Sequence, residues 1–133
     1  MTGGTRVTID RDVDIVTARQ IGRQMAAEAG FSGSDLTMIA TAISEVARNI
    51  VEYAKRGEVR LETASKHGRK GLVVVANDDG PGIPDIEQAM QDGFSTGRSL
   101  GLGLPGARRL MDEFEIVSEP GKGTTITMRK WCG

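Results

Sequence analysis

The sequence predicts an α+β fold, a two-layer α/β sandwich in which helices cover one face of a mixed β-sheet. Three segments repeat apolar residues at steps of three and four, as amphipathic helices do. Several shorter segments, apolar throughout or alternating apolar and polar, predict strands. A chain of 133 residues fits one domain, so residues 1–133 are expected to form a single unit.

The N-terminal region is expected to place a strand before a helix. Residues 5–9 alternate and predict an edge strand, after which Asp10 or Asp12 can cap the helix. Gly30 is placed to end this helix. Its inward face is made of mostly small residues at helical steps: Ile15, Ala18, Gly22, Met25 and Ala29.

A second helix is expected to begin between Ser32 and Asp35, with Ser34 as its N-cap. It should run to about Lys55 and end at Gly57. Its buried stripe is apolar: Leu36, Ile39, Ile43, Val46 or Ala47, and Ile50.

Two strands, 58–63 and 71–76, are expected next, joined by a solvated hairpin turn at 65–71. The second strand is apolar at every position from Leu72 to Ala76, which predicts a central place in the sheet.

The remaining elements are expected in the order helix, loop, helix, strand, strand. A short helix fits 85–91, and residues 92–100 are typical of a mobile loop. A third long helix fits roughly 103–112, and strands near 114–118 and 123–130 close the chain.

The composition excludes several classes of protein. Lys plus Arg is 17 and Asp plus Glu is 18, which argues against broad nucleic-acid binding through a basic surface. The single cysteine, Cys132, excludes a disulfide framework and favours a reducing compartment. No segment approaches the ~20 apolar residues of a membrane span, and no signal peptide is visible. We therefore expect a cytoplasmic protein that binds neither nucleic acid nor membrane.

A turn with two glycines follows the apolar strand: Asp78-Asp79-Gly80-Pro81-Gly82-Ile83. Asp-Gly and Pro-Gly pairs also make ordinary turns, so this segment alone is consistent with a plain turn. A carboxylate followed by two flexible glycines can also hold a polar ligand against bare backbone. Matching chemistry elsewhere in the chain must decide between the two.

Glu45 and Asn49 lie four residues apart, so their side chains stack on one side of the second helix, away from its apolar stripe. Most such residues form a solvated polar face. Asn49 argues against that interpretation, because asparagine is about 0.6 kcal/mol worse than alanine inside a helix and no cap or turn needs it here. The pair can hold Mg²⁺ or its water and leave Glu45 free to act as a base.

Glycines precede the third helix, where residues 101–106 match G-x-G-x-x-G. No strand precedes them, so we exclude a dinucleotide-binding Rossmann unit. Such glycines can present backbone N–H groups and the helix dipole to phosphate, or simply form a flexible loop and N-cap. Residues 121–124 are typical of a hairpin turn, although the Thr124 hydroxyl can also reach a ligand. No nucleophile–base pair or Cys/His metal set is evident, and His67 lies in a charged turn.

Three ordered clusters, Glu45-x-x-x-Asn49, Asp78-x-Gly80-x-Gly82 and Gly101-x-Gly103, together resemble the GHKL ATP-binding superfamily. This superfamily includes gyrase, Hsp90, histidine kinases, MutL and the anti-sigma-factor kinases. The resemblance covers nearly the whole chain and implies the Bergerat ATP-binding fold. Because the short chain has neither the dimerisation helices of histidine kinases nor the transducer domain of gyrase-type ATPases, it is most similar to the small bacterial serine/threonine kinases of partner-switching pathways.

The resemblance assigns roles to individual residues. Asn49 would ligate the Mg²⁺ that bridges the ATP phosphates, and Glu45 would be the general base. Asp78 would accept a hydrogen bond from the adenine amino group, while Gly80 and Gly82 let the base approach. Residues 92–100 would be an ATP lid, shorter than that of histidine kinases. The other positions assigned to the nucleotide are Ile83, Gly97, Gly101, Leu102, Gly103, Leu104 and Thr124.

The resemblance also implies partners. The substrates would be Ser or Thr residues of STAS-domain proteins of the stressosome, which also sequester the kinase. When released, the kinase would activate a partner phosphatase by direct contact. Alternatives are an anti-sigma-factor-type kinase, a noncatalytic nucleotide-dependent sequestering module, and an ATPase without a protein acceptor.

Overall fold

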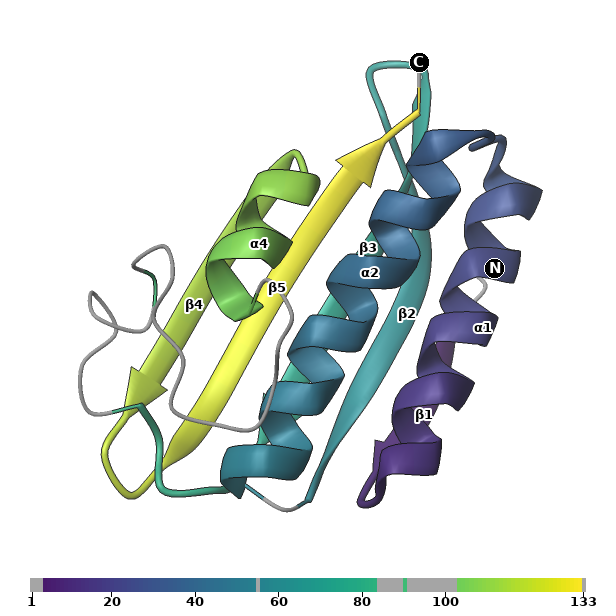
Figure 1. Ribbon diagram of the computed structural model, residues 1–133. Helices are drawn as coiled ribbons and strands as arrows, with labels where there is room; N and C mark the ends of the chain where they lie inside the picture. Colours follow the sequence, from purple (N-terminus) through teal and green to yellow (C-terminus); the bar gives the residue numbers. More distant parts are fainter. Residues whose placement is uncertain (1–3, 55, 84–89, 91–102, 133) are drawn as a thin grey trace.

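The computed structural model describes residues 4–54, 56–83, 90 and 103–132 (Figure 1). The elements follow in the order β1 (Gly4–Ile9), α1 (Asp12–Ala29), α2 (Ser34–Asn49), η1 (Ile50–Ala54), β2 (Gly57–Lys66), β3 (Arg69–Asp78), α4 (Gly103–Leu110), β4 (Glu113–Glu119) and β5 (Gly123–Trp131). The predicted short helix at 85–91 and the loop at 92–100 fall outside the described residues, apart from residue 90. None of the helices described is both long and apolar enough to cross a membrane.

Within the described residues, five strands form one sheet in the order β1-β2-β3-β5-β4. The three α-helices lie over the same face of this sheet, which confirms the predicted two-layer sandwich (Figure 1). β1 is an edge strand and β3 is central, as the sequence predicts.

The prediction of a mixed sheet is wrong, because each neighbouring pair of the described strands is antiparallel. Two consecutive helices join β1 to β2, so the chain returns to the end of the sheet where β1 stopped. β3 and β4 do run in the same direction, since both are antiparallel to β5, but β5 lies between them. β3 and β4, which would form a parallel pair if they were neighbours, are therefore kept apart by β5.

Helix α1 begins differently from the prediction. Neither Asp10 nor Asp12 caps it. Instead, Oδ2 of Asp14 accepts hydrogen bonds from the backbone N–H groups of Asp10 and Arg11, at 2.9 and 3.0 Å. A carboxylate in the first turn also interacts favourably with the helix dipole. The predicted end at Gly30 is confirmed, since this residue has a left-handed φ of 110°.

Helix α2 is capped by Gly33 and begins at Ser34, so the predicted N-cap at Ser34 is wrong by one residue and the helix starts one residue earlier than that cap implies. After Asn49 it continues as the single π-helical turn η1, so the predicted extent to about residue 55 holds while the hydrogen-bonding pattern changes. Such π turns occur mostly inside α-helices and often at functional sites.

The hairpin between β2 and β3 is longer than predicted. The strands continue to Lys66 and Arg69, so most of the expected loop at 65–71 is paired strand. The turn itself is His67-Gly68, and both residues have positive φ, 53° and 78°. This is the backbone that tight hairpin turns require.

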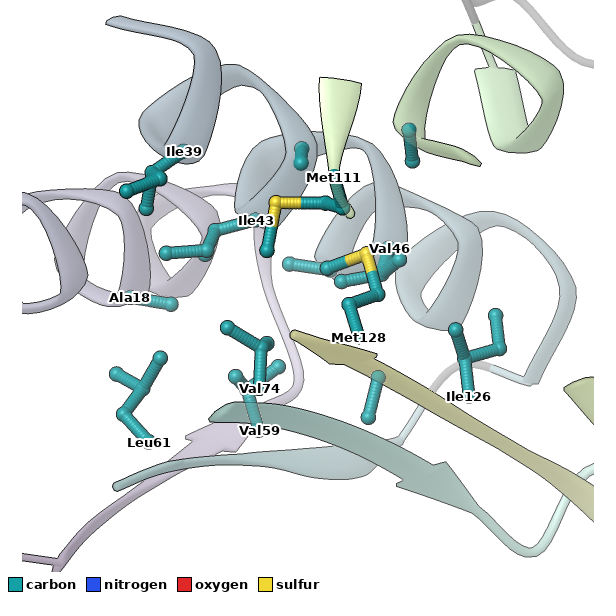
Figure 2. Packing of buried hydrophobic residues seen from close by; sticks show 14 of the residues in the cluster. Ala18, Ile39, Ile43, Val46, Val59, Leu61, Val74, Met111, Ile126 and Met128 are labelled. Atoms are coloured by element: carbon teal, nitrogen blue, oxygen red, sulfur yellow. The ribbon is translucent and has the colours of Figure 1, made fainter. Parts of the chain in front are cut away.

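The core lies between the sheet and the helices (Figure 2). Ile43 and Val46 of α2 point toward Val74 of β3 and Met128 of β5, and all four are fully buried. Burying each such side chain contributes about 1.5–3 kcal/mol. This packing fixes the rotation of α2 about its axis, so Glu45, on another side of the helix, meets the first residue of α4.

Candidate active site

Glu45 lies where helix α2 meets the start of α4. Its side chain is only 7% exposed. Its Oε1 accepts a hydrogen bond from the backbone N–H of Gly103, the first residue of α4, at 3.2 Å. The same oxygen lies 3.2 Å from Nη1 of Arg48. The predicted base is therefore in direct contact with the predicted phosphate-binding end of a helix.

Asn49 is the last residue of α2 before the π turn, one helical turn beyond Glu45. It is half-buried. Its side chain makes no hydrogen bond to any part of the chain that the structure describes. A neutral amide oxygen in this state is a suitable ligand for Mg²⁺ or for a water of its shell. Among the described residues, no group of three or more His, Cys, Asp or Glu side chains could hold a metal ion. Asn49 is the metal ligand that the sequence resemblance predicts.

Asp78 ends the central strand β3 and is 6% exposed. Its Oδ1 accepts a hydrogen bond from the backbone N–H of Gly80 at 2.9 Å. Burial raises the pKa of Asp78 above its ordinary value of 3.8, against the lowering effect of hydrogen bonds from the backbone at Gly80 and Thr124. Removing a charged carboxylate from water costs free energy, and a carboxyl group with its pKa shifted by burial is typical of a functional site.

The two glycines after Asp78 are required by the packing of the protein itself. A Cβ on Gly80 would lie 2.5 Å from the Cβ of Ala54 in η1. Gly82 has a φ of 80°, and a Cβ there would collide with the carbonyl oxygen of Glu119. Their predicted role in admitting an adenine ring stays a prediction.

Ser118 of β4 contacts two of the predicted site residues and is a candidate that the sequence did not indicate. Its Oγ accepts a hydrogen bond from the backbone N–H of Ile83 at 2.7 Å and lies 2.9 Å from Oγ1 of Thr124. Thr124 is 4% exposed, stands opposite Asp78 in the β3–β5 register and opposite Ser118 in the β4–β5 register. Counting the register of the last hairpin would have placed Ser118 beside Thr124.

Of the remaining predicted site residues, one lies within the described part of the chain and three lie outside it. The side chain of Leu104 is buried in the core, so only its backbone is available to a ligand. Gly97, Gly101 and Leu102 lie outside the described residues. A pocket of ≈ 360 Å³ lies beside Asp78 and is lined also by Ala54 and Gly57, but it does not reach Glu45 or Asn49.

Replacing Gly123 by alanine is expected to lower the free energy of unfolding by about 2 kcal/mol or more. Gly123 has a φ of 87°, and a Cβ there would collide with the backbone oxygen of Asp78. Gly121 is a matched control, because its φ is 79° but open space surrounds its Cβ position. Gly121→Ala should therefore lose only about 1 kcal/mol. Equal losses in urea unfolding would contradict the close approach at Asp78.

Comparison with known proteins decides the family. Residues 10–130 match the family model described as the histidine kinase-like ATPase domain. The chain belongs to this family. The catalytic domain of the histidine kinase ThkA superimposes with a TM-score of 0.53 at 14% sequence identity, covering 96% of this chain and 95% of that one. At this identity the likeness shows the fold of the histidine kinase-like ATPase domain alone.

Sequence relatives within the family are more specific. The chain is 54% identical over 125 residues to the serine/threonine-protein kinase RsbT of Bacillus subtilis (strain 168), covering 94% of each. It is 34% identical over 121 residues to the anti-sigma F factor of Thermoanaerobacter sp. (strain X514), covering 87% of this chain and 84% of the relative. The resemblance to small serine/threonine kinases of this ATP-binding superfamily is thereby confirmed.

Proposed function

We propose that this chain is an ATP-dependent serine/threonine-protein kinase. The observation that carries the proposal is the buried carboxylate of Glu45, hydrogen-bonded to the first backbone N–H of α4. Binding of ATP and Mg²⁺ alone needs no base at this position. A carboxylate retained there, at the helix end expected to contact phosphates, is best explained by proton transfer.

The proposed reaction assigns a role to each group. Glu45 takes the proton of the acceptor hydroxyl as its oxygen attacks the γ-phosphorus of ATP. One O–P bond forms, the bond to the bridging oxygen breaks, and ADP leaves. Phosphoryl transfer of this kind depends more on positioning and charge neutralisation than on covalent help from the protein. The position of Glu45, held between α2 and α4, is therefore central to the mechanism.

Asn49 and Asp78 would hold the two ends of the nucleotide. The amide of Asn49, which has no hydrogen bond within the described residues, suits a Mg²⁺ ion, which when bound would neutralise charge on the phosphates. The carboxylate of Asp78 would accept a hydrogen bond from the adenine amino group. Gly80 already donates to Oδ1 of Asp78, which fixes the orientation of the carboxylate before any ligand binds.

The relatives favour a serine/threonine-protein kinase over an anti-sigma F factor. Identity is higher to the serine/threonine-protein kinase than to the anti-sigma F factors, 54% against 34%. From the resemblance noted in the sequence, we propose STAS-domain stressosome proteins as substrates and sequestering partners, and a phosphatase as the partner that the released kinase activates. An anti-sigma-factor-type kinase is the second candidate, favoured by the similarity to the anti-sigma F factors.

Incubation with γ-labelled ATP, with and without a STAS-domain protein, tests the proposal. Label transferred to the STAS-domain protein is the expected result. Release of phosphate without transfer would identify an ATPase, and neither reaction would identify a noncatalytic module. Either of the last two results would overturn the kinase assignment.

Replacing Asp78 by asparagine is expected to weaken ATP binding at least about tenfold, because a charged acceptor that is nearly buried is lost. The folded-state pKa of Asp78 is raised, so its ionisation costs stability as the pH rises from 3.8 through the folded-state value. Asp78→Asn removes this cost, and the variant should be at least as stable as wild type at pH 7. Calorimetry with ATP and thermal unfolding measure the two effects. Asp79→Asn, at the exposed neighbour, is the control, and wild-type ATP affinity in Asp78→Asn would refute the assignment.

A further inference from the structure

Within the described residues, the carboxylate of Glu45 is held at one oxygen and has no partner at the other. Oε1 receives both the backbone N–H of Gly103 and Nη1 of Arg48, each at 3.2 Å. Oε2 has no bonding partner within the part of the chain that the structure describes. Among the described residues, the two contacts therefore fix the carboxylate by a single oxygen.

Arg48 is the cation that balances this charge. Its side chain is 34% exposed, whereas that of Glu45 is 7% exposed. A charge buried to this extent is costly unless it is paired. Among the described residues, Glu45 is the one carboxylate within ion-pair distance of Arg48. Since the two residues lie three apart on α2, the helix sets the distance between them.

We propose that Arg48 is a positioning residue for the base, holding Oε1 so that Oε2 meets the acceptor hydroxyl. The proposal rests on the kinase function proposed above. In this proposal Arg48 contacts Glu45 and does not contact the nucleotide. Its replacement should therefore slow the chemical step without changing the affinity for ATP. The backbone N–H of Gly103, at the start of α4, holds the same oxygen, so the orientation of the base also depends on the position of α4.

The chemistry of arginine suits this position. The guanidinium is planar, always charged and presents its donors in a fixed arrangement, so a single contact orients it. Lysine keeps the charge but as a flexible point donor. Glutamine keeps a long side chain and a high helix propensity while losing the charge. These two replacements separate charge from geometry and should both preserve the helix.

The test measures kcat, the KM for ATP and the ATP affinity by calorimetry in Arg48→Gln and Arg48→Lys. Arg48→Gln is expected to lower kcat about 10- to 100-fold, the loss typical of a misplaced catalytic group, with ATP affinity within about twofold of wild type. Arg48→Lys should recover most of the lost rate. Arg60→Gln is the matched control, because Arg60 pairs with Glu58 at 3.8 Å on β2, away from α4, and it should behave as wild type.

Repeating the Arg48→Gln replacement in the Glu45→Gln variant tests whether Arg48 acts through Glu45. In Glu45→Gln, adding Arg48→Gln should cost no further rate, because there is no longer a base to position. Wild-type kcat in Arg48→Gln would overturn the proposal. So would an equal fold loss of kcat when Arg48→Gln is added to wild type and to Glu45→Gln. A parallel loss of ATP affinity would also overturn it and would place Arg48 on the nucleotide. Wild-type protein that transfers no phosphate would instead refute the kinase function, and the inference with it.

Discussion

Replacing Asn49 by alanine is expected to reduce phosphate transfer about 1,000-fold or more while leaving the fold intact. Loss of the proposed metal ligand would remove charge neutralisation worth about 4 kcal/mol in the transition state. Stability should not fall, because the Asn49 side chain makes no hydrogen bond within the described residues and alanine is a better helix former by about 0.6 kcal/mol. Transfer of label from ATP and urea unfolding measure the two effects. Asn49→Asp should also abolish transfer.

The combination of inactivity and undiminished stability is what identifies a functional asparagine. Gln24→Ala is a suitable control, since Gln24 is an exposed amide on α1. It should change neither transfer nor stability by a measurable amount. Normal phosphate transfer in Asn49→Ala would refute the metal assignment, whatever the stability of the variant.

Replacing Glu45 by glutamine is expected to lower the rate of transfer about 100- to 10,000-fold, the usual contribution of a general base. The amide keeps the size of the side chain and can still accept the hydrogen bond from Gly103. ATP affinity should stay close to wild type, because the proposed contacts of the nucleotide are made by Asn49 and Asp78. Single-turnover transfer and calorimetry with ATP separate these two quantities.

Glu28→Gln on the exposed surface of α1 provides the corresponding control. It removes the same carboxylate from a position remote from α4 and should leave the rate unchanged. Wild-type rates in Glu45→Gln would show that the carboxylate is not the base. The buried ion pair with Arg48 would then be structural.

The elements of this fold could be predicted from sequence because each has a local signal. The apolar stripe of α2 and the wholly apolar run in β3 both follow from periodicity, and both segments are found as expected. The direction of strand pairing has no such local signal. Whether β5 pairs beside β3 or beyond β4 depends on tertiary packing, and this choice made the predicted mixed sheet wrong. The hydrogen bonds of Asp14 at the start of α1 depend likewise on side-chain orientation.

The site could be predicted in part for the same reason. Glu45, Asn49 and Asp78 stand in recognisable spacings, and the structure places Glu45 against the first residue of α4. Ser118 and the contact of Arg48 with Glu45 were missed, because they depend on strand register and on side-chain orientation. The glycines at 80 and 82 were identified correctly as special positions, yet the structure explains them by contacts with Ala54 and Glu119.

The identity of the phosphorylated residue is the most direct test of the proposed serine/threonine kinase activity. The fold is shared with the catalytic domain of a histidine kinase, so the acceptor distinguishes the two kinds of enzyme. Labelled STAS-domain protein should be treated with acid, treated with alkali, and analysed by mass spectrometry. Phosphoserine or phosphothreonine is expected, stable in acid and absent when Glu45→Gln replaces the wild type. Acid-labile phosphohistidine, or no label on the protein, would contradict the proposed activity.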